Sequence, residues 1–200
     1  MEDVLSLLDW KRRVFSLYAQ VRAEPSPQKA WKAWRAGRDE LFAQHPQSPL
    51  PEHLREDFQG LDYFDYDRQA RVLATFRPST RPDVEMANSD RGTTRFQRVG
   101  IAEFELHGRS AELELYWLDA YGGGLFLPFR DATAGKTSYG AGRYVLDTVK
   151  GADLGSEDGR LVLDFNFAYQ PSCSYDAGWS CPLAPAPNHL SLAIEAGEKL

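Results

Sequence analysis

The first 45 residues of the chain carry apolar side chains at three- and four-residue intervals, which is the spacing of amphipathic helices. One helix is predicted over residues 3–23, where a single lysine interrupts the apolar stripe. A second helix is predicted to begin at Ser26-Pro27, because serine favours the N-cap and proline the first helical position. This helix should end before Pro46, since the residue that precedes a proline disfavours helical geometry.

From about residue 60 onward, the helical spacing gives way to alternation of apolar and polar residues, the pattern of half-buried strands. Residues 101–106 and 111–117 both alternate with period two, and residues 107–110 between them suit a hairpin turn. Further strands are predicted at 71–77, 93–98, 125–129, 143–149, 160–169 and 190–195. Short strands with no long helix between them indicate antiparallel pairing in a barrel or a sandwich.

The proline-bearing segment 46–60 (PQSPLPEHLREDFQG) separates these two patterns, with one helical turn predicted at 52–58. We therefore expect residues 1–60 to form an N-terminal helical annex with its connector, and residues 61–200 to form a β-rich domain. The predicted fold class is α+β, with a helical pair packed on a mostly antiparallel β-barrel or β-sandwich.

The net charge of the chain narrows the kinds of partner that the protein could bind. The chain of 200 residues has 23 Lys and Arg against 29 Asp and Glu, a net charge of −6. Domains that bind nucleic acid usually have a basic excess, so this balance disfavours a nucleic-acid partner. No apolar run is long enough to span a bilayer, and residues 1–5 (MEDVL) lack the basic start of a signal peptide. We expect a cytoplasmic protein without nucleic-acid or membrane partners, and the sequence specifies neither a cofactor nor an oligomeric state.

The second predicted helix is basic although the chain as a whole is acidic. Lys29, Lys32, Arg35 and Arg38 follow one another at three-residue spacing. The simplest interpretation is a solvated face whose aliphatic stems cover apolar neighbours. A docking face for an acidic partner is the alternative interpretation.

Familiar catalytic signatures are incomplete in this sequence. Gly135-Lys136-Thr137 resembles the end of a phosphate-binding loop, but the position of its first glycine is occupied by Arg130. None of the four histidines falls between residues 108 and 188. This distribution weakens the case for Ser–His or Cys–His catalysis and for a multi-histidine metal site, and no metal site is predicted.

Two segments, 126–147 and 160–188, place polar residues among aromatic ones. They are either bonded to one another as a structural network, because buried polar groups must be paired, or they line a pocket for a small anionic molecule. In a pocket, arginine would anchor a carboxylate or a phosphate. The predicted ligand-binding residues are Arg143, Tyr144, Asn166, Thr133 and Thr137, and the predicted acid–base residues are Asp131, Asp164 and Tyr139.

The only two cysteines, Cys173 and Cys181, lie in a proline-rich loop at 171–187. Packed free thiols are the favoured interpretation, and a disulfide that closes a short loop is the next. A catalytic or redox thiol pair and a metal site remain open alternatives. A metal would need two more ligands, for which Asp176 and His189 are the nearest candidates.

These segments resemble a bacterial and archaeal family catalogued as domain of unknown function 1684. The resemblance covers nearly the whole chain and is carried by residues 61–67 (LDYFDYD), 129–133 (FRDAT), 137–144 (TSYGAGRY), 164–166 (DFN), 181–182 (CP) and 196–198 (AGE). The chain departs from the family pattern at Gln170, where asparagine is usual, and at His189, where arginine is common. The resemblance implies that the matching residues belong to one site or one structural network, and it implies no reaction, cofactor or catalytic residue.

The leading functional hypothesis is a protein that binds a small anionic molecule in a pocket at one end of the β domain. The first alternative is a hydrolase or lyase that uses aspartate or tyrosine acid–base groups in the same pocket. The second is a structural or interaction protein that presents the basic helix at 29–38 to a partner. Whether Arg143 and Asp164 line a cavity or lie in a closed network of ion pairs discriminates the first two from a purely structural role.

Overall fold

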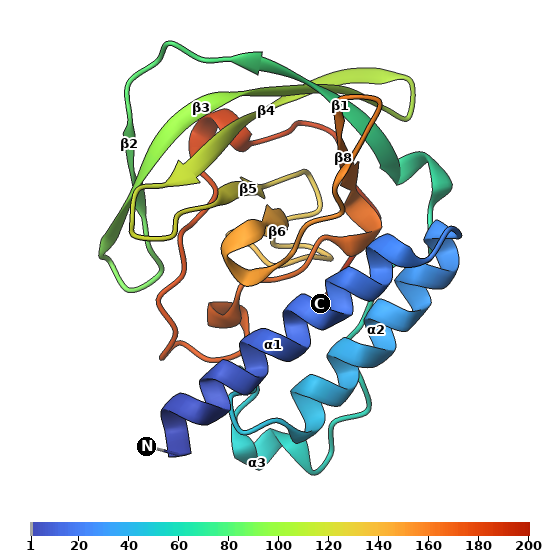
Figure 1. The fold of residues 1–200 in the computed structure, drawn as a ribbon, viewed down its shortest axis with the longest axis vertical. Coiled ribbons are helices and arrows are strands. Elements are labelled where there is room, and N and C mark those ends of the chain that lie inside the picture. The colour runs from blue at the N-terminus through green and yellow to red at the C-terminus, as the bar shows by residue number, and fades with distance from the viewer. Residues whose placement is uncertain (1) are drawn as a thin grey trace.

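Two antiparallel helices lie side by side against a curled sheet in the computed structural model of the protein (Figure 1), which describes residues 2–200. They are α1 (Glu2–Ala23) and α2 (Pro27–Gln44), and the short helix α3 (Glu52–Arg55) follows in the connector. The predicted helices are confirmed. Ser26 does occupy the N-cap of α2, but its side chain makes no capping hydrogen bond.

Eight strands form one sheet, and every pair of neighbouring strands is antiparallel. The strands are β1 (Arg71–Pro78), β2 (Val84–Ala87), β3 (Thr93–Leu106), β4 (Arg109–Leu118), β5 (Leu125–Phe129), β6 (Arg143–Asp147), β7 (Ser156–Glu157) and β8 (Arg160–Asp164). Their order is β6-β5-β4-β3-β1-β8-β7, with β2 paired to β3. The sheet curls into a half-barrel (Figure 1), which confirms the α+β class.

The long hairpin of β3 and β4 turns where the sequence predicts it. His107 and Gly108 have φ of 51° and 71°, the left-handed geometry that a two-residue hairpin turn requires. The predicted strands at 93–98 and 101–106 are parts of the single strand β3, and the pairing register shifts between Arg98 and Gly100. Strand β2 was not predicted, because its four residues offer too few positions to show an alternation.

Three predicted strand regions end early or are absent. Residues 165–167 and 148–150 turn into 3-10 helices, because the side chains of Asp164 and Asp147 accept hydrogen bonds from the backbone N–H groups of these turns. The predicted strand at 190–195 is wrong. That segment is buried at Leu192 and Ile194 but pairs with no strand of the described chain.

One hydrophobic cluster fills the concave face of the sheet, and a second joins the helices to the β-rich part. Trp34 is fully buried at the centre of the second cluster. Its ring lies 5.6 Å from that of Tyr63 and 5.0 Å from that of Phe167, so this cluster draws side chains from both sides of residue 60. The division at residue 60 stays a prediction. No helix within residues 2–200 combines the length and apolar character needed to cross a membrane.

Candidate functional site

Arg143, the predicted anion anchor, lies on β6 inside a network that leaves 1% of the residue exposed. Its Nη1 donates to the carbonyls of Ala196 (2.5 Å) and Glu198 (3.1 Å), and its Nη2 to the carbonyl of Ile194 (2.9 Å). Alternate carbonyls along one edge of an extended segment therefore take their donors from one guanidinium instead of from a neighbouring strand. This explains how Ile194, Ala196 and Glu198 remain buried without entering the sheet.

Asp131 completes this network from the opposite side. Its carboxylate lies 3.4 Å from Arg143 Nη2, accepts a 2.6 Å hydrogen bond from the backbone N–H of Ile194, and accepts another from the Thr133 hydroxyl. Thr133 also bonds Ser138 at 2.7 Å, which ties the turn at 133–138 together. Thr137 lies at the exposed end of this turn. Arg143, Asp131 and Thr133 are therefore brought together as predicted, and their contacts favour the structural interpretation.

The extended segment approaches the chain closely at Gly197, which has a φ of +80°. A Cβ atom at this position would stand 2.6 Å from the carbonyl oxygens of Phe165 and Ala168. Only glycine fits there, because both the backbone conformation and the lack of space exclude a side chain. This requirement accounts for the glycine of the AGE motif.

Asp164 and Asn166 form a second buried network at the end of β8. Asp164 Oδ1 accepts bonds from the backbone N–H and the side-chain amide of Asn166. The Asn166 side chain also exchanges two hydrogen bonds, of 2.8 and 2.7 Å, with the backbone of Asp67. The chain leaves the predicted strand at Asp164, so Asn166 lies in the 3-10 helix that follows. From there Asn166 braces the segment that precedes β1.

Burial raises the pKa of Asp164 to about 6, and hydrogen bonds from Asn166 only partly offset this desolvation. The other carboxylate oxygen, Oδ2, has no hydrogen-bond partner among the described residues. The folded protein therefore binds a proton at Asp164 more tightly than the unfolded chain, whose aspartate pKa is about 3.9. The stabilising contribution of this proton is complete below about pH 4 and is lost as the pH rises through 6.

We expect Asp164→Asn to remove this pH dependence, because asparagine keeps the accepting oxygen and carries no charge. The free energy of unfolding of the variant, relative to the parent, should rise by about 2–3 kcal/mol between pH 4 and pH 7. Urea denaturation at a series of pH values measures this difference. The exposed Asp65→Asn variant is the control. A parent–variant difference that does not change with pH would contradict the assignment.

Tyr139 and Tyr144 lie in a third cluster, beside the two cysteines. The Tyr139 hydroxyl is 3.8 Å from Cys173 Sγ, and the Tyr144 hydroxyl donates a 2.5 Å hydrogen bond to the carbonyl of Pro182. Cys173 and Cys181 are free thiols, with Cys173 half-buried and Cys181 buried. The predicted site residues thus fall into three networks instead of one pocket, and their binding and acid–base roles remain predictions.

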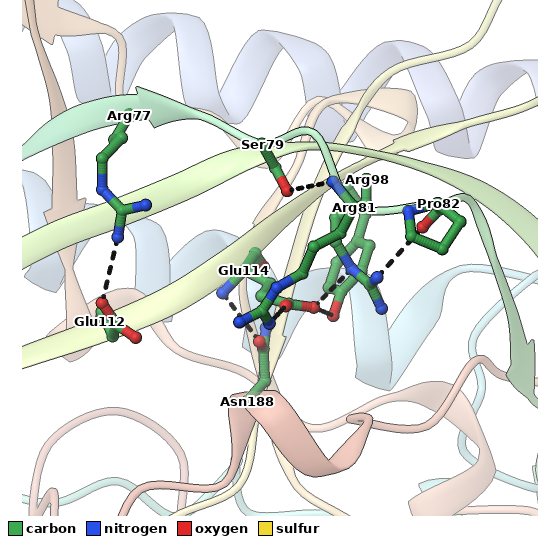
Figure 2. Close-up of polar contacts among 9 residues, drawn as sticks. Arg77, Ser79, Arg81, Pro82, Arg98, Glu112, Glu114 and Asn188 are labelled. Atoms are coloured by element: carbon green, nitrogen blue, oxygen red, sulfur yellow. Dashed lines mark hydrogen bonds and ion pairs between the residues drawn. The ribbon is translucent and has the colours of Figure 1, made fainter.

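A further buried polar group, centred on Glu114 of β4, was missed from the sequence (Figure 2). Its alternating strand suggests a solvent-facing position, yet Glu114 is buried and forms ion pairs with Arg81 (2.5 Å) and Arg98 (2.7 Å). Figure 2 also shows Asn188 against the same strand. The Asn188 amide exchanges bonds with the Glu114 backbone and donates to the carbonyl of Pro128. It occupies the gap where β4 and β5 are no longer paired.

The structure has a cleft between the helical pair and the loop that carries the cysteines. Its volume is about 430 Å³, within the range of small-molecule sites. The lining is mainly aliphatic and aromatic and comes from α1, α2, residues 149–152 and residues 169–181. Of the residues predicted for the pocket and the cysteine pair, only Cys181 belongs to this lining, and Arg38 of the predicted basic helix joins it. Sequence reasoning missed the cleft because its walls follow the periodicity of ordinary core positions.

The basic stripe of α2 leads into this cleft. Lys29 and Lys32 are exposed, Arg35 stacks on the rings of Trp31 and Tyr63, and Arg38 is buried. The interpretation of residues 29–38 as one solvated basic face is therefore wrong at its C-terminal end. The spacing of three residues, shorter than the helical repeat of 3.6, rotates successive side chains around the helix and turns Arg38 inward.

The protein is an α+β protein in which a helical pair packs on a curled antiparallel sheet. Buried polar networks hold its C-terminal segment in place. Residues 56–199 match the family described as "Protein of unknown function (DUF1684)", so the chain belongs to DUF1684. The chain is also similar to an uncharacterised protein from gene locus rrnAC0354 of Haloarcula marismortui, determined by solution NMR, with 40% identity and a TM-score of 0.62. That similarity covers 86% of this chain and 94% of the other. No curated protein matches the chain.

Proposed function

We propose that the protein binds a small amphipathic carboxylate in the cleft between its helices and the cysteine-bearing loop. The observation that carries this proposal is the charge of the lining. Three cationic residues, Lys11, Arg38 and Lys150, contribute to it, whereas no Asp or Glu does. This local excess stands out in a chain with a net charge of −6. The proposal keeps the anionic ligand predicted from the sequence and moves its site away from Arg143.

Arg38 supplies a cation at the cleft that is not fully occupied by the protein. Its Nη2 pairs with Glu198 Oε2 at 3.0 Å, while Nη1 is buried and has no hydrogen-bond partner among the described residues. The guanidinium lies over the rings of Phe42 and Tyr169, which also line the cleft. A carboxylate is a suitable partner for such a group, since charge-assisted hydrogen bonds are the stronger ones.

The remaining lining suits the apolar part of such a ligand. Trp10, Val14 and Leu17 of α1 face Leu41 and Phe42 of α2 across it. The other two cations come from separate elements, Lys11 from α1 and Lys150 from the turn after β6. The Lys150 side chain is half exposed and lies 3.8 Å from Asp147, so it is held loosely. A ligand with an apolar tail and an anionic head complements both the apolar walls and the cationic residues. A compact anion such as phosphate would leave the apolar walls exposed to water.

Sodium decanoate, with 1-decanol as its uncharged counterpart, tests the proposal by isothermal titration calorimetry. We expect decanoate to bind at one site, at least about tenfold more tightly than decanol, because a charge-assisted hydrogen bond contributes more than about 1.4 kcal/mol. The paired substitution Lys11→Met with Lys150→Met should weaken decanoate binding by about tenfold. The same substitutions at Lys29 and Lys32, which are exposed on α2 away from the cleft, are the matched control and should leave binding unchanged.

A second variant fills the cleft without altering its charge. Val14→Trp places a large ring on the α1 wall and should abolish decanoate binding while the melting temperature stays close to that of the parent. Absence of decanoate binding to the parent, or equal binding by the paired lysine variant, would overturn the proposal. The enzyme and basic-helix alternatives gain no comparable support, because Asp131 and Asp164 lie outside the cleft lining and Arg38 is turned inward.

A further inference from the structure

The two cysteines are placed in a way that packing alone does not require. Cys173 belongs to the short 3-10 helix at Ser172–Ser174, and its backbone N–H donates to Cys181 Sγ at 3.3 Å. Cys173 is half-buried, whereas Cys181 is buried. A small reagent can therefore reach the Cys173 sulfur, whereas the Cys181 sulfur is buried behind it.

The environment gives the two thiols opposite proton affinities. The neighbouring Cys181 thiol is the largest cause that lowers the pKa of Cys173 to about 6, and the Tyr139 hydroxyl, 3.8 Å from Cys173 Sγ, adds to it. The same contact with Cys173, together with burial, raises the pKa of Cys181. These shifts favour the thiolate at Cys173 and the protonated thiol at Cys181.

Hydrogen bonds with Ser89 hold the Cys181 end of the loop in place. Cys181 N–H donates to Ser89 Oγ at 3.1 Å, and Ser89 N–H donates to the Cys181 carbonyl at 2.9 Å. Ser89 Oγ in turn donates to the carbonyl of Trp179. These bonds anchor Cys181 to the segment after β2, so it is Cys173, on the more exposed side, that would move when a reagent attaches. The segment 176–180 between the two cysteines is exposed.

We propose that Cys173 and Cys181 form a redox-active dithiol that reduces low-molecular-weight disulfides by thiol–disulfide exchange. The Cys173 thiolate attacks one sulfur of a disulfide RSSR, forms a Cys173–S–S–R bond and releases RS⁻. That leaving thiolate takes the proton of Cys181. The Cys181 thiolate then attacks Cys173 Sγ, forms the Cys173–Cys181 disulfide and releases the second RS⁻. Two electrons pass from the protein to RSSR, and the protein is restored by a thiol reductant.

The thiol of lower pKa is suited to the first attack, because the thiolate is the nucleophile in exchange. The buried cysteine is suited to the second step, since it reaches only the sulfur that lies against it. Cys181 lines the cleft and Cys173 does not, and the exchange reaction needs no ligand in the cleft. This inference therefore holds or fails separately from the carboxylate-binding proposal.

Oxidised glutathione is the probe. The reduced parent protein should lose two hydrogens in intact-mass analysis and release two molecules of reduced glutathione. Cys181→Ser should instead retain one glutathione on Cys173, because the second attack is missing. Cys173→Ser should react far more slowly. If the parent remains fully reduced, or keeps one glutathione without closing a disulfide, the proposal is wrong.

A second measurement needs no added disulfide. The rate of alkylation of Cys173 by iodoacetamide, followed against pH, should show an inflection near 6 in the parent. In Cys181→Ala the inflection should move to higher pH, because the group that stabilises the Cys173 thiolate is removed, whereas a serine hydroxyl would still donate to it. Thermal melting of the serine and alanine variants verifies that they are folded. An inflection at the ordinary thiol pKa of about 8.5 in the parent would contradict the inferred pairing.

Discussion

Arg143→Met should lower the free energy of unfolding by about 3–5 kcal/mol, the cost of breaking a buried ion pair by removing one partner. The substitution leaves the Asp131 carboxylate buried without its counter-ion. It also removes the donors of the carbonyls at Ile194, Ala196 and Glu198, none of which can turn to a neighbouring strand. Equilibrium denaturation in urea, followed by circular dichroism, measures the loss.

Arg130→Met is the matched control, because Arg130 is exposed. A surface substitution of this kind should change the stability by less than about 0.5 kcal/mol. Arg143→Lys should be nearly as damaging as methionine, since an ammonium cannot reproduce the planar fork of the guanidinium. A folded Arg143→Met variant of unchanged stability would show that Arg143 does not hold the C-terminal segment, and would revive its predicted role as an anion anchor.

Trp34→Ala should cost about 3–5 kcal/mol as well, the range observed when a buried tryptophan is truncated. Trp34 is fully buried and contacts Tyr18 of α1 and Phe167 of the β-rich part. Because the ring bridges the two parts, its loss should lower the stability of the whole chain and not of the helices alone. Urea unfolding should stay a single transition, coincident when followed by far-ultraviolet circular dichroism and by tryptophan fluorescence.

Trp117→Ala is the control for the loss of an aromatic side chain, because Trp117 is 41% exposed. Its effect on the unfolding free energy should be much smaller. Two separate transitions in Trp34→Ala, with the helical signal lost first, would contradict a shared core. That outcome would support the predicted boundary at residue 60 as a division between independently folding units.

The helices were predictable because two local signals agree along the first 45 residues. Apolar spacing marks the buried face, and Pro25, Pro27 and Pro46 mark the boundaries. The hairpin at His107 was equally predictable, because the alternation on both sides and the short polar turn are local signals. The ends of β6 and β8 could not be predicted, because Asp147 and Asp164 end their strands by capping turns that alternation does not reveal.

The polar networks show a different limit of sequence reasoning. The residues of the first network were singled out from the sequence, but Arg143 donates to backbone carbonyls more than 50 residues away, which no side-chain pattern encodes. Glu114 was missed for the opposite reason. It sits in a clean alternation that predicts exposure, yet it is buried, because Arg81, Arg98 and Asn188 from other segments bond to it. Both errors arise from long-range packing overriding a local pattern.

The C-terminal segment that Arg143 holds has a consequence for biosynthesis. A chain made from its N-terminus can begin to fold before synthesis ends. Here, however, the guanidinium of β6 lacks its three carbonyl acceptors, and the carboxylate of Asp131 lacks the N–H of Ile194, until residues 194–198 have left the ribosome. The nascent β-rich part therefore remains incompletely closed. The core position that Ile194 will fill is meanwhile exposed to water or to a chaperone. Closure of this fold therefore depends on the emergence of residues 194–198, however much of the chain folds earlier.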